Sequence, residues 1–184
     1  MLLAVFPVPP LLYSFLGDLA INKGKAMKTT IRVLLCFGLM LFVTALWAAP
    51  PFEGTYSANG KNAKLAFLIA KKGDPFSGNP TTVLVFSEKD ASKDPRADFH
   101  AQMGDLGDAL VIRLMKDGDK WDVIGSEFAH SALKHSGASG TGIISVSDVT
   151  VANGEISGHL TTHANADLFD EPLAIDLRFH VKQP

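Results

Sequence analysis

The stretch LAIDLRFHV, residues 173–181, alternates between apolar and polar side chains. Successive side chains of a β-strand point to opposite faces of a sheet, whereas a helix needs apolar residues three and four positions apart. The stretch therefore predicts a strand with one face in a core and the other in solvent. The side chains expected to point inward are Leu173, Ile175, Leu177, Phe179 and Val181.

Seven further segments are short, alternating or rich in β-branched residues, and Gly, Pro, Asn or Asp residues bound them. Such segments are typical of strands. Together they predict an all-β fold, an antiparallel two-layer β-sandwich of the immunoglobulin-like kind with about eight strands. These expected strands cover residues 52–58, 65–70, 81–87, 109–115, 121–125, 142–151 and 155–162.

Three connections are rich in polar and flexible residues. Residues 71–80 and 87–98 contain several Pro, Gly, Lys and Asp residues, which predicts two long loops. Residues 126–137 fit either a short helix that ends at Gly137 or a continuation of the preceding strand. The sequence leaves both alternatives open.

The pair Asp117-Gly118 lies between two expected strands and can form a two-residue hairpin turn. That turn would place Leu114 opposite Trp121 on the core face. It would place Arg113 opposite Asp122 on the other face. Apolar side chains then meet apolar ones and opposite charges meet, so this register is the prediction.

The pair Asn153-Gly154 predicts a second hairpin by the same reasoning. Its register sets Val151 opposite Ile156, and it sets Asp148 opposite His159 on the outer face. A third pairing, between residues 155–162 and the last strand, would set His159 opposite Asp176. A long loop joins these two strands, and a slip by two residues would preserve the faces.

The N-terminal part of the chain has the features of an export signal, starting at Met27. Two basic side chains, Lys28 and Arg32, precede an apolar run over residues 33–46, and small residues and prolines follow it. The run is shorter than the roughly 20 residues that cross a bilayer. We therefore expect residues 27–49 to be a cleaved signal peptide, and the mature protein to be periplasmic or secreted.

Residues 1–26 fit no targeting class, because three prolines interrupt them and no basic segment precedes them. The codons of Lys23-Gly24 can contain the core of a bacterial ribosome-binding site just before Met27. We interpret residues 1–26 as translated upstream DNA and residues 50–184 as a single β-sandwich domain. The alternative is a membrane anchor built from both apolar stretches.

The composition changes when the expected leader is removed. The whole chain has a net charge of −2, with 17 basic and 19 acidic side chains. Residues 49–184 keep 13 of the basic and 18 of the acidic ones, so their net charge is −5. An acidic domain argues against nucleic-acid binding and against adsorption to anionic lipid. The only cysteine, Cys36, lies in the signal, so the mature chain has no disulfide or thiol chemistry.

The six histidines include one that the expected registers place between two carboxylates. His159 would stand between Asp148 and Asp176 on three neighbouring strands, and such a set could hold zinc or manganese. The simpler interpretation is a hydrogen-bonded ion pair at the surface, which contributes little to stability.

The run GEISGHLTTHANADLFDEPLAIDLRFHV, residues 154–181, resembles the C-terminal part of β-sandwich domains in exported bacterial proteins of unknown function. It combines a hairpin strand, a loop that carries Phe169-Asp170 and a final strand of the form Ile-Asp-Leu-Arg-Phe. The resemblance implies the fold and export. It implies no functional residue.

Motifs of phosphate-binding loops, dinucleotide-binding folds, zinc proteases and serine hydrolases are missing from the sequence. We therefore expect a non-catalytic binding or interaction module for an unknown protein or small-molecule ligand, with no membrane anchor once the signal is cleaved. Phe76 and Phe169, both in expected loops, are candidate anchors for a partner. The alternative function is metal binding in the His159 region.

Overall fold

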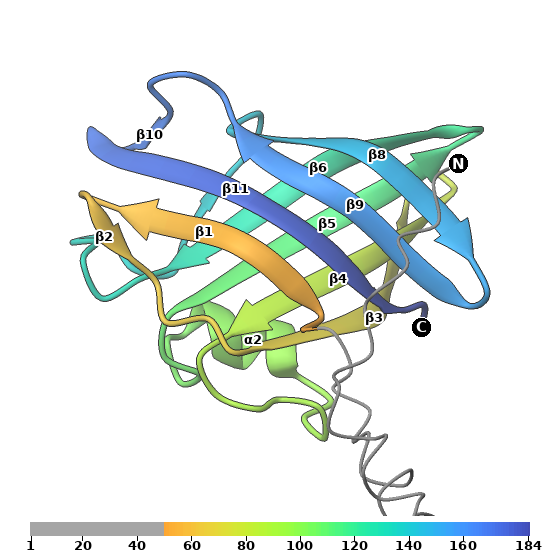
Figure 1. The fold of residues 1–184 in the computed structure, drawn as a ribbon, viewed down its shortest axis with the longest axis horizontal. Coiled ribbons are helices and arrows are strands. Elements are labelled where there is room, and N and C mark those ends of the chain that lie inside the picture. Colours follow the sequence, from red (N-terminus) through yellow and green to blue (C-terminus); the bar gives the residue numbers. More distant parts are fainter. Residues whose placement is uncertain (1–49) are drawn as a thin grey trace, which may run out of the picture. The chain divides into compact units, whose positions relative to one another are not determined.

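Two antiparallel β-sheets pack face to face in the computed structural model, which describes residues 50–184 (Figure 1). These residues form one compact unit. The predicted all-β, antiparallel two-layer sandwich is confirmed. The expected signal peptide and the segment before it lie outside the described residues.

The first sheet has the order β2-β1-β11-β9-β8, with β10 paired to β11, and the second has the order β3-β4-β5-β6-β7. One helix, α2, spans Ala97–Gln102. The strand bounds are β1 Phe52–Ala58, β2 Lys61–Asn62, β3 Phe67–Phe76, β4 Asn79–Ser87, β5 Ala109–Asp117, β6 Lys120–Ala129, β7 Ala138–Gly140, β8 Ile144–Ala152, β9 Glu155–Thr162, β10 Asp167–Leu168 and β11 Glu171–Lys182.

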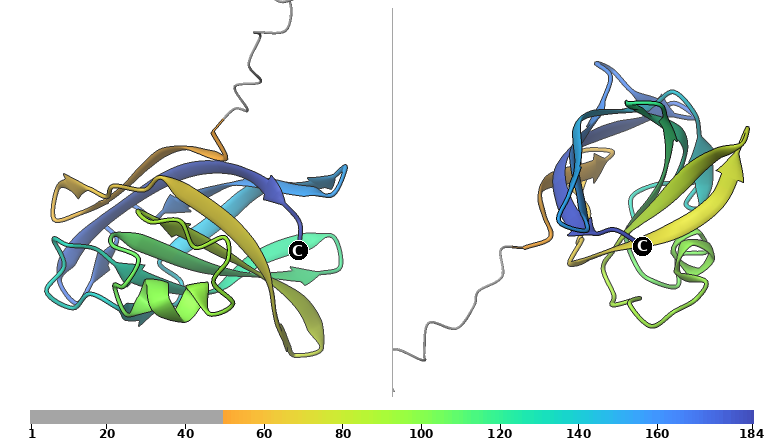
Figure 2. Two further views of the ribbon diagram at one scale, coloured as in Figure 1. Left: turned by 90° about the horizontal axis from the view of Figure 1, so that it is seen from below. Right: turned by 90° about the vertical axis from the view of Figure 1, so that its right-hand side faces the viewer.

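Most neighbouring strands are also consecutive in the chain, so both sheets are meanders. There are two exceptions. The strands β9 and β11 pair although β10 lies between them in the chain, and β1 pairs with β11, which joins the two ends of residues 50–184 within one sheet. This order differs from the Greek-key arrangement of immunoglobulin domains, whose sheets combine strands from distant parts of the chain. The two views in Figure 2 show that the strands twist strongly around the shared core.

The core between the sheets is built from alternating positions, as the last strand predicts. Leu173, Ile175, Leu177 and Phe179 are buried, and the residues between them are exposed. A second apolar cluster lies on the outer face of the second sheet, where α2 covers β4 and β5 through Ala97 and Ala101. This cover explains why β4 is buried on both faces.

The β5–β6 hairpin has a different turn from the predicted one. Gly118 and Asp119 form the two-residue loop, and only Gly118 has a positive φ, which fits a type II′ turn. The strand register therefore shifts, and Val123 rather than Trp121 stands opposite Leu114.

A bulge shifts this register again further along the hairpin. Arg113 stands opposite Gly125 and not opposite Asp122, so the predicted pairing is wrong. Its guanidinium instead donates to Glu127, with an N to O distance of 3.1 Å.

The β8–β9 hairpin has the predicted Asn153-Gly154 turn, and both residues have a positive φ. The pairing of Val151 with Ile156 is confirmed. A bulge between Ser147 and Thr150 then shifts the register. Asp148, at the bulge, has a φ of 53°.

The three connections also differ from their predictions. Residues 71–80 are not a loop, because β3 and β4 continue to a two-residue Ser77-Gly78 turn. The segment 87–98 is a loop up to Arg96, where α2 follows. In residues 126–137 the strand alternative is correct as far as Ala129, and turns follow it.

Within residues 50–184, α2 is the one helix, and it is too short to cross a bilayer.

Candidate functional site

His159 and Asp176 lie together on the outer face of the first sheet, as predicted, but through a different register. Arg178 is the residue opposite His159, and Asp176 is opposite Thr161, two positions from the expected pairing. The side chains meet diagonally, with 2.6 Å between His159 Nε2 and Asp176 Oδ1. The histidine side chain is 16% exposed and the aspartate 74%. This is a hydrogen-bonded pair at the surface.

Asp148 does not join this pair, so the structure does not bring the three predicted metal ligands together. The bulge in β8 puts Ser147 opposite His159, and the Asp148 carboxylate instead accepts from the Ser147 hydroxyl. In the part of the chain that the structure describes, no group of three His, Cys, Asp or Glu side chains could hold a metal ion.

A buried carboxylate, Asp108, fastens the loop that follows β6. Its Oδ1 accepts from the Ser131 amide at 2.8 Å and its Oδ2 from the Lys64 amide at 3.1 Å. Burial raises the pKa of Asp108, but the two amides and nearby His130 outweigh burial, so the pKa lies below its ordinary value. The carboxylate is therefore held ionised between two backbone segments.

Glu171, at the start of β11, holds the same loop from the other side. Its carboxylate accepts from the Lys134 amide at 3.0 Å and from Asn59 Nδ2 at 2.9 Å. These donors, the Lys134 amide foremost, lower the pKa of Glu171 against the effect of burial. The two carboxylates thus order residues 130–137 between the ends of the two sheets.

His130 lies beside Asp108 but is not oriented as a catalytic base. Its Nδ1 accepts from the Ala132 amide at 2.9 Å, so the ring proton of the neutral form is on Nε2. In a hydrolase triad, Nδ1 would donate to the carboxylate. Nε2 is buried and has no hydrogen-bond partner within residues 50–184. The arrangement is that of a structural histidine, packed edge to face on Tyr56 at 5.1 Å between ring centroids.

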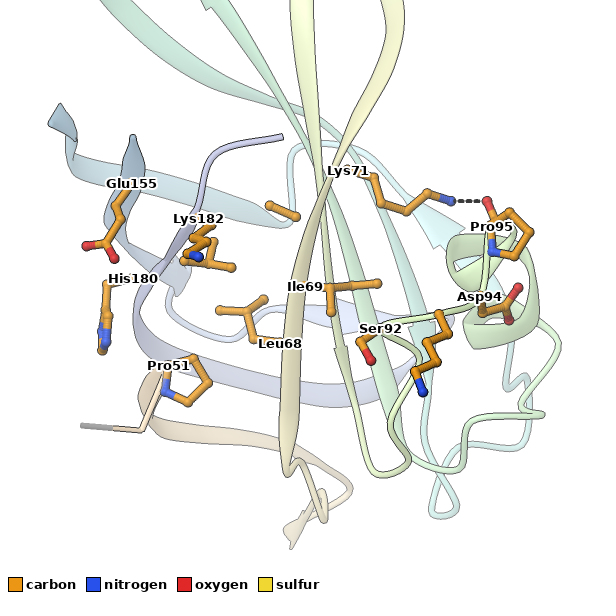
Figure 3. A pocket seen from close by; sticks show the side chains of 13 residues that line it. Pro51, Leu68, Ile69, Lys71, Ser92, Asp94, Pro95, Glu155, His180 and Lys182 are labelled. Atoms are coloured by element: carbon orange, nitrogen blue, oxygen red, sulfur yellow. Dashed lines mark hydrogen bonds between the residues drawn. The ribbon is translucent and has the colours of Figure 1, made fainter. Parts of the chain in front are cut away.

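A groove with a volume of about 670 Å³ follows one edge of the second sheet, beside β3 (Figure 3). Leu68, Ile69 and Ala70 of β3 form its apolar floor. One wall is the end of β11 at Val181, with Pro51 next to it. The other wall is the loop of residues 92–95.

Charged side chains stand around this groove. Lys71 Nζ binds Asp98 and the Pro95 carbonyl oxygen, each at 2.7 Å. Asp94 lies 2.6 Å from His100. These contacts fasten the loop of residues 92–95 to β3 and α2.

Lys93 and Lys182 are exposed at the rim of the groove, and neither makes an ion pair within residues 50–184. Glu155 stands opposite Lys182 on the neighbouring strand. The groove thus combines an apolar floor with two amino groups that can meet an anionic ligand.

Sequence reasoning missed this groove because its lining comes from five separate segments and contains no motif. The one sequence signal is the apolar run of residues 65–70, which indicates a strand but not that the strand lies at an edge. The predicted anchors Phe76 and Phe169 are 53% and 64% exposed, and neither lines the groove.

Comparisons of the chain with protein-family models, with curated proteins and with solved structures found no match.

Proposed function

We propose that residues 50–184 are an exported, non-catalytic binding module, and that the groove beside β3 is its binding site. One observation supports this function above others: the groove pairs an apolar floor with an open, charged rim. Its volume of about 670 Å³ falls in the range of known ligand sites, which hold roughly 300–1,000 Å³. A ligand with an apolar body and an anionic group would fit both features.

Binding rather than catalysis is proposed because of where the titratable groups lie. Catalytic acids and bases commonly owe their reactivity to burial and to a neighbouring charge that shifts their pKa. In this groove Glu155, His180 and Lys182 are exposed, and Asp94 is engaged by His100. The buried groups Asp108 and Glu171 are engaged in ordering a loop.

Export is the second part of the proposal, and it rests on the signal-like features of residues 27–49. A chain that starts at Met27 should be exported as well as the full chain, with a mature N-terminus at Ala49 or Pro50. N-terminal sequencing of the exported protein tests this. Recovery of exported protein that still carries residues 1–26 would contradict it.

The binding part can be tested with anilinonaphthalene sulfonate, a fluorescent probe with an apolar body and one anionic group. We expect one molecule to bind per chain. We expect binding to weaken about tenfold when Lys93→Glu and Lys182→Glu are combined, because the anion then faces two like charges. Lys61→Glu, the same change on β2 outside the groove, is the control. Equal binding by all three proteins would contradict a site in the groove.

A further inference from the structure

The strand that forms the floor of the groove is an edge strand. Within residues 50–184, β3 pairs only with β4, and this pairing is regular from Phe67 to Gly73. An edge strand directs the N–H and C=O groups of alternate residues away from its neighbour, where another chain can pair with them. The residues that line the groove, 68–71, lie within this regular part.

The groove also has a wall on each face of β3. Leu68 points toward Pro51 and β11, whereas Ile69 points to the opposite side, toward Ser92 (Figure 3). The two residues accordingly belong to different apolar clusters, Leu68 to the core between the sheets and Ile69 to the cluster beneath α2. Successive side chains of a strand also point to opposite faces. A strand laid along β3 would therefore find contacts for both sets of its side chains.

We propose that the occupant of this groove is an extended, acidic segment of a partner protein that pairs with β3 as an added strand. The inference rests on the proposed function and names the ligand class for that site. Backbone hydrogen bonds to β3 supply affinity in this mode of recognition, and the two walls select the side chains at alternate positions.

Charge indicates that the added strand is acidic. The lining contains three lysines, Lys71, Lys93 and Lys182, and two carboxylates. Lys71 and the carboxylate of Asp94 are engaged by residues outside the lining. One positive charge remains in excess, in a domain whose net charge is −5. Acidic side chains of a ligand would therefore meet a local excess of positive charge at the groove.

A second copy of the chain fits this edge less well. Pairing of β3 with β3 would bring Lys71 and Lys72 of each copy beside those of the other, and lysines on an edge strand oppose such pairing. A small amphipathic molecule could fill the apolar floor but would leave the outward backbone groups of β3 unpaired. An acidic peptide strand would both bring negative charge to the lysines and pair with the outward N–H and C=O groups of β3.

The test uses the protein purified after export and a synthetic peptide of about eight residues with alternating glutamate and valine. We expect the peptide to displace anilinonaphthalene sulfonate and to slow hydrogen exchange of alternate β3 amides about tenfold. The same peptide with methylated backbone nitrogens keeps its side chains but cannot donate to β3, so it should not displace the probe. A lysine-valine peptide is the charge control, and it should bind at least about tenfold more weakly.

The outcomes separate this inference from the proposed function. If the probe binds but the acidic peptide neither displaces it nor protects β3, strand addition is overturned and the binding groove stands. Equal displacement by the methylated peptide would also overturn strand addition. If neither the probe nor the peptide binds, both proposals fail. Protection of β3 amides that is lost in the Lys93→Glu, Lys182→Glu protein, but kept in Lys61→Glu, supports the inference.

Discussion

Within residues 50–184, Phe169 is the bulkiest of the non-glycine residues that have a positive φ. Phe169 and Asp170 form the two-residue turn between β10 and β11, and both have a positive φ, of 54° and 65°. Type I′ turns need this conformation and favour Asn, Asp or Gly, because a bulky side chain strains it. The ring is also 64% exposed, although it lies near His135, with 5.5 Å between ring centroids.

We therefore predict that Phe169→Asn raises the free energy of unfolding by about 0.5 to 1 kcal/mol, since Asn tolerates a positive φ. Urea unfolding measures this change. Phe169→Leu removes the ring but keeps a side chain that is strained at this φ, so it should give no gain. Equal stabilisation by both variants would attribute the effect to the exposed ring and not to the turn.

The carboxylates of Asp108 and Glu171 should make stability depend on pH. The pKa of each lies below its ordinary value in the folded protein. Their contribution to the free energy of unfolding is therefore complete above the pKa values of the unfolded chain, which are about 4. It is lost as the pH falls through the lower pKa values of the folded protein. The free energy of unfolding measured from about pH 6 to 3 should show this loss, and in Glu171→Gln it should depend less on pH. If its dependence on pH is unchanged in both Glu171→Gln and Asp108→Asn, the role of these groups is contradicted.

The pair of His159 and Asp176 should not bind zinc measurably. Zinc sites use at least three protein ligands, and the structure brings only these two together. Calorimetric titration with zinc from about pH 5.5 to 8 should give equal heats for the wild type and for His159→Ala. Heat that appears in the wild type alone and grows with pH would restore the metal interpretation.

At the scale of elements, two-residue turns set the sheet registers. Four of the five such turns have two residues with positive φ, at Asn59-Gly60, Ser77-Gly78, Asn153-Gly154 and Phe169-Asp170. The fifth, Gly118-Asp119, needs positive φ only at its first residue. The sequence predicts Asp117-Gly118 as the turn, with Gly118 second. Because Gly118 is first in the observed turn, Leu114 stands opposite Val123 and not opposite Trp121.

Gly118→Ala should destabilise the protein by about 1 kcal/mol through backbone strain alone, because no atom lies within 4 Å of the added Cβ. The comparison is Gly125→Ala in β6, where φ is not positive and the added Cβ meets only Arg113 Cδ at 3.7 Å. That change should cost nothing measurable by urea unfolding. Equal effects of both substitutions would contradict the assigned turn.

At the scale of the whole described domain, two apolar clusters share the same strands. Leu84 and Phe86 of β4 face the core between the sheets, and Val83 and Val85 face the cluster beneath α2. Because both clusters are built on the backbone of β4, unfolding of one cluster should also unfold the other.

We accordingly expect Val85→Ala to destabilise the protein by about 2 kcal/mol and to leave unfolding as a single transition. Fluorescence of Trp121, which packs against the core between the sheets, should report the same midpoint as far-ultraviolet circular dichroism. Separate midpoints would show that the cluster beneath α2 unfolds on its own.

The sequence by itself determined the fold class, the burial of alternate residues in β11 and the Asn153-Gly154 hairpin, because each depends on residues that are contiguous in the chain. Only the tertiary structure decided the bulge that separates Asp148 from His159, and the turn and bulge that together move Arg113 away from Asp122. A bulge adds one residue to one strand, so it moves every later pairing while the apolar pattern stays almost the same. The groove beside β3 also depended on tertiary structure, since an edge and its two walls exist only once separate segments pack together.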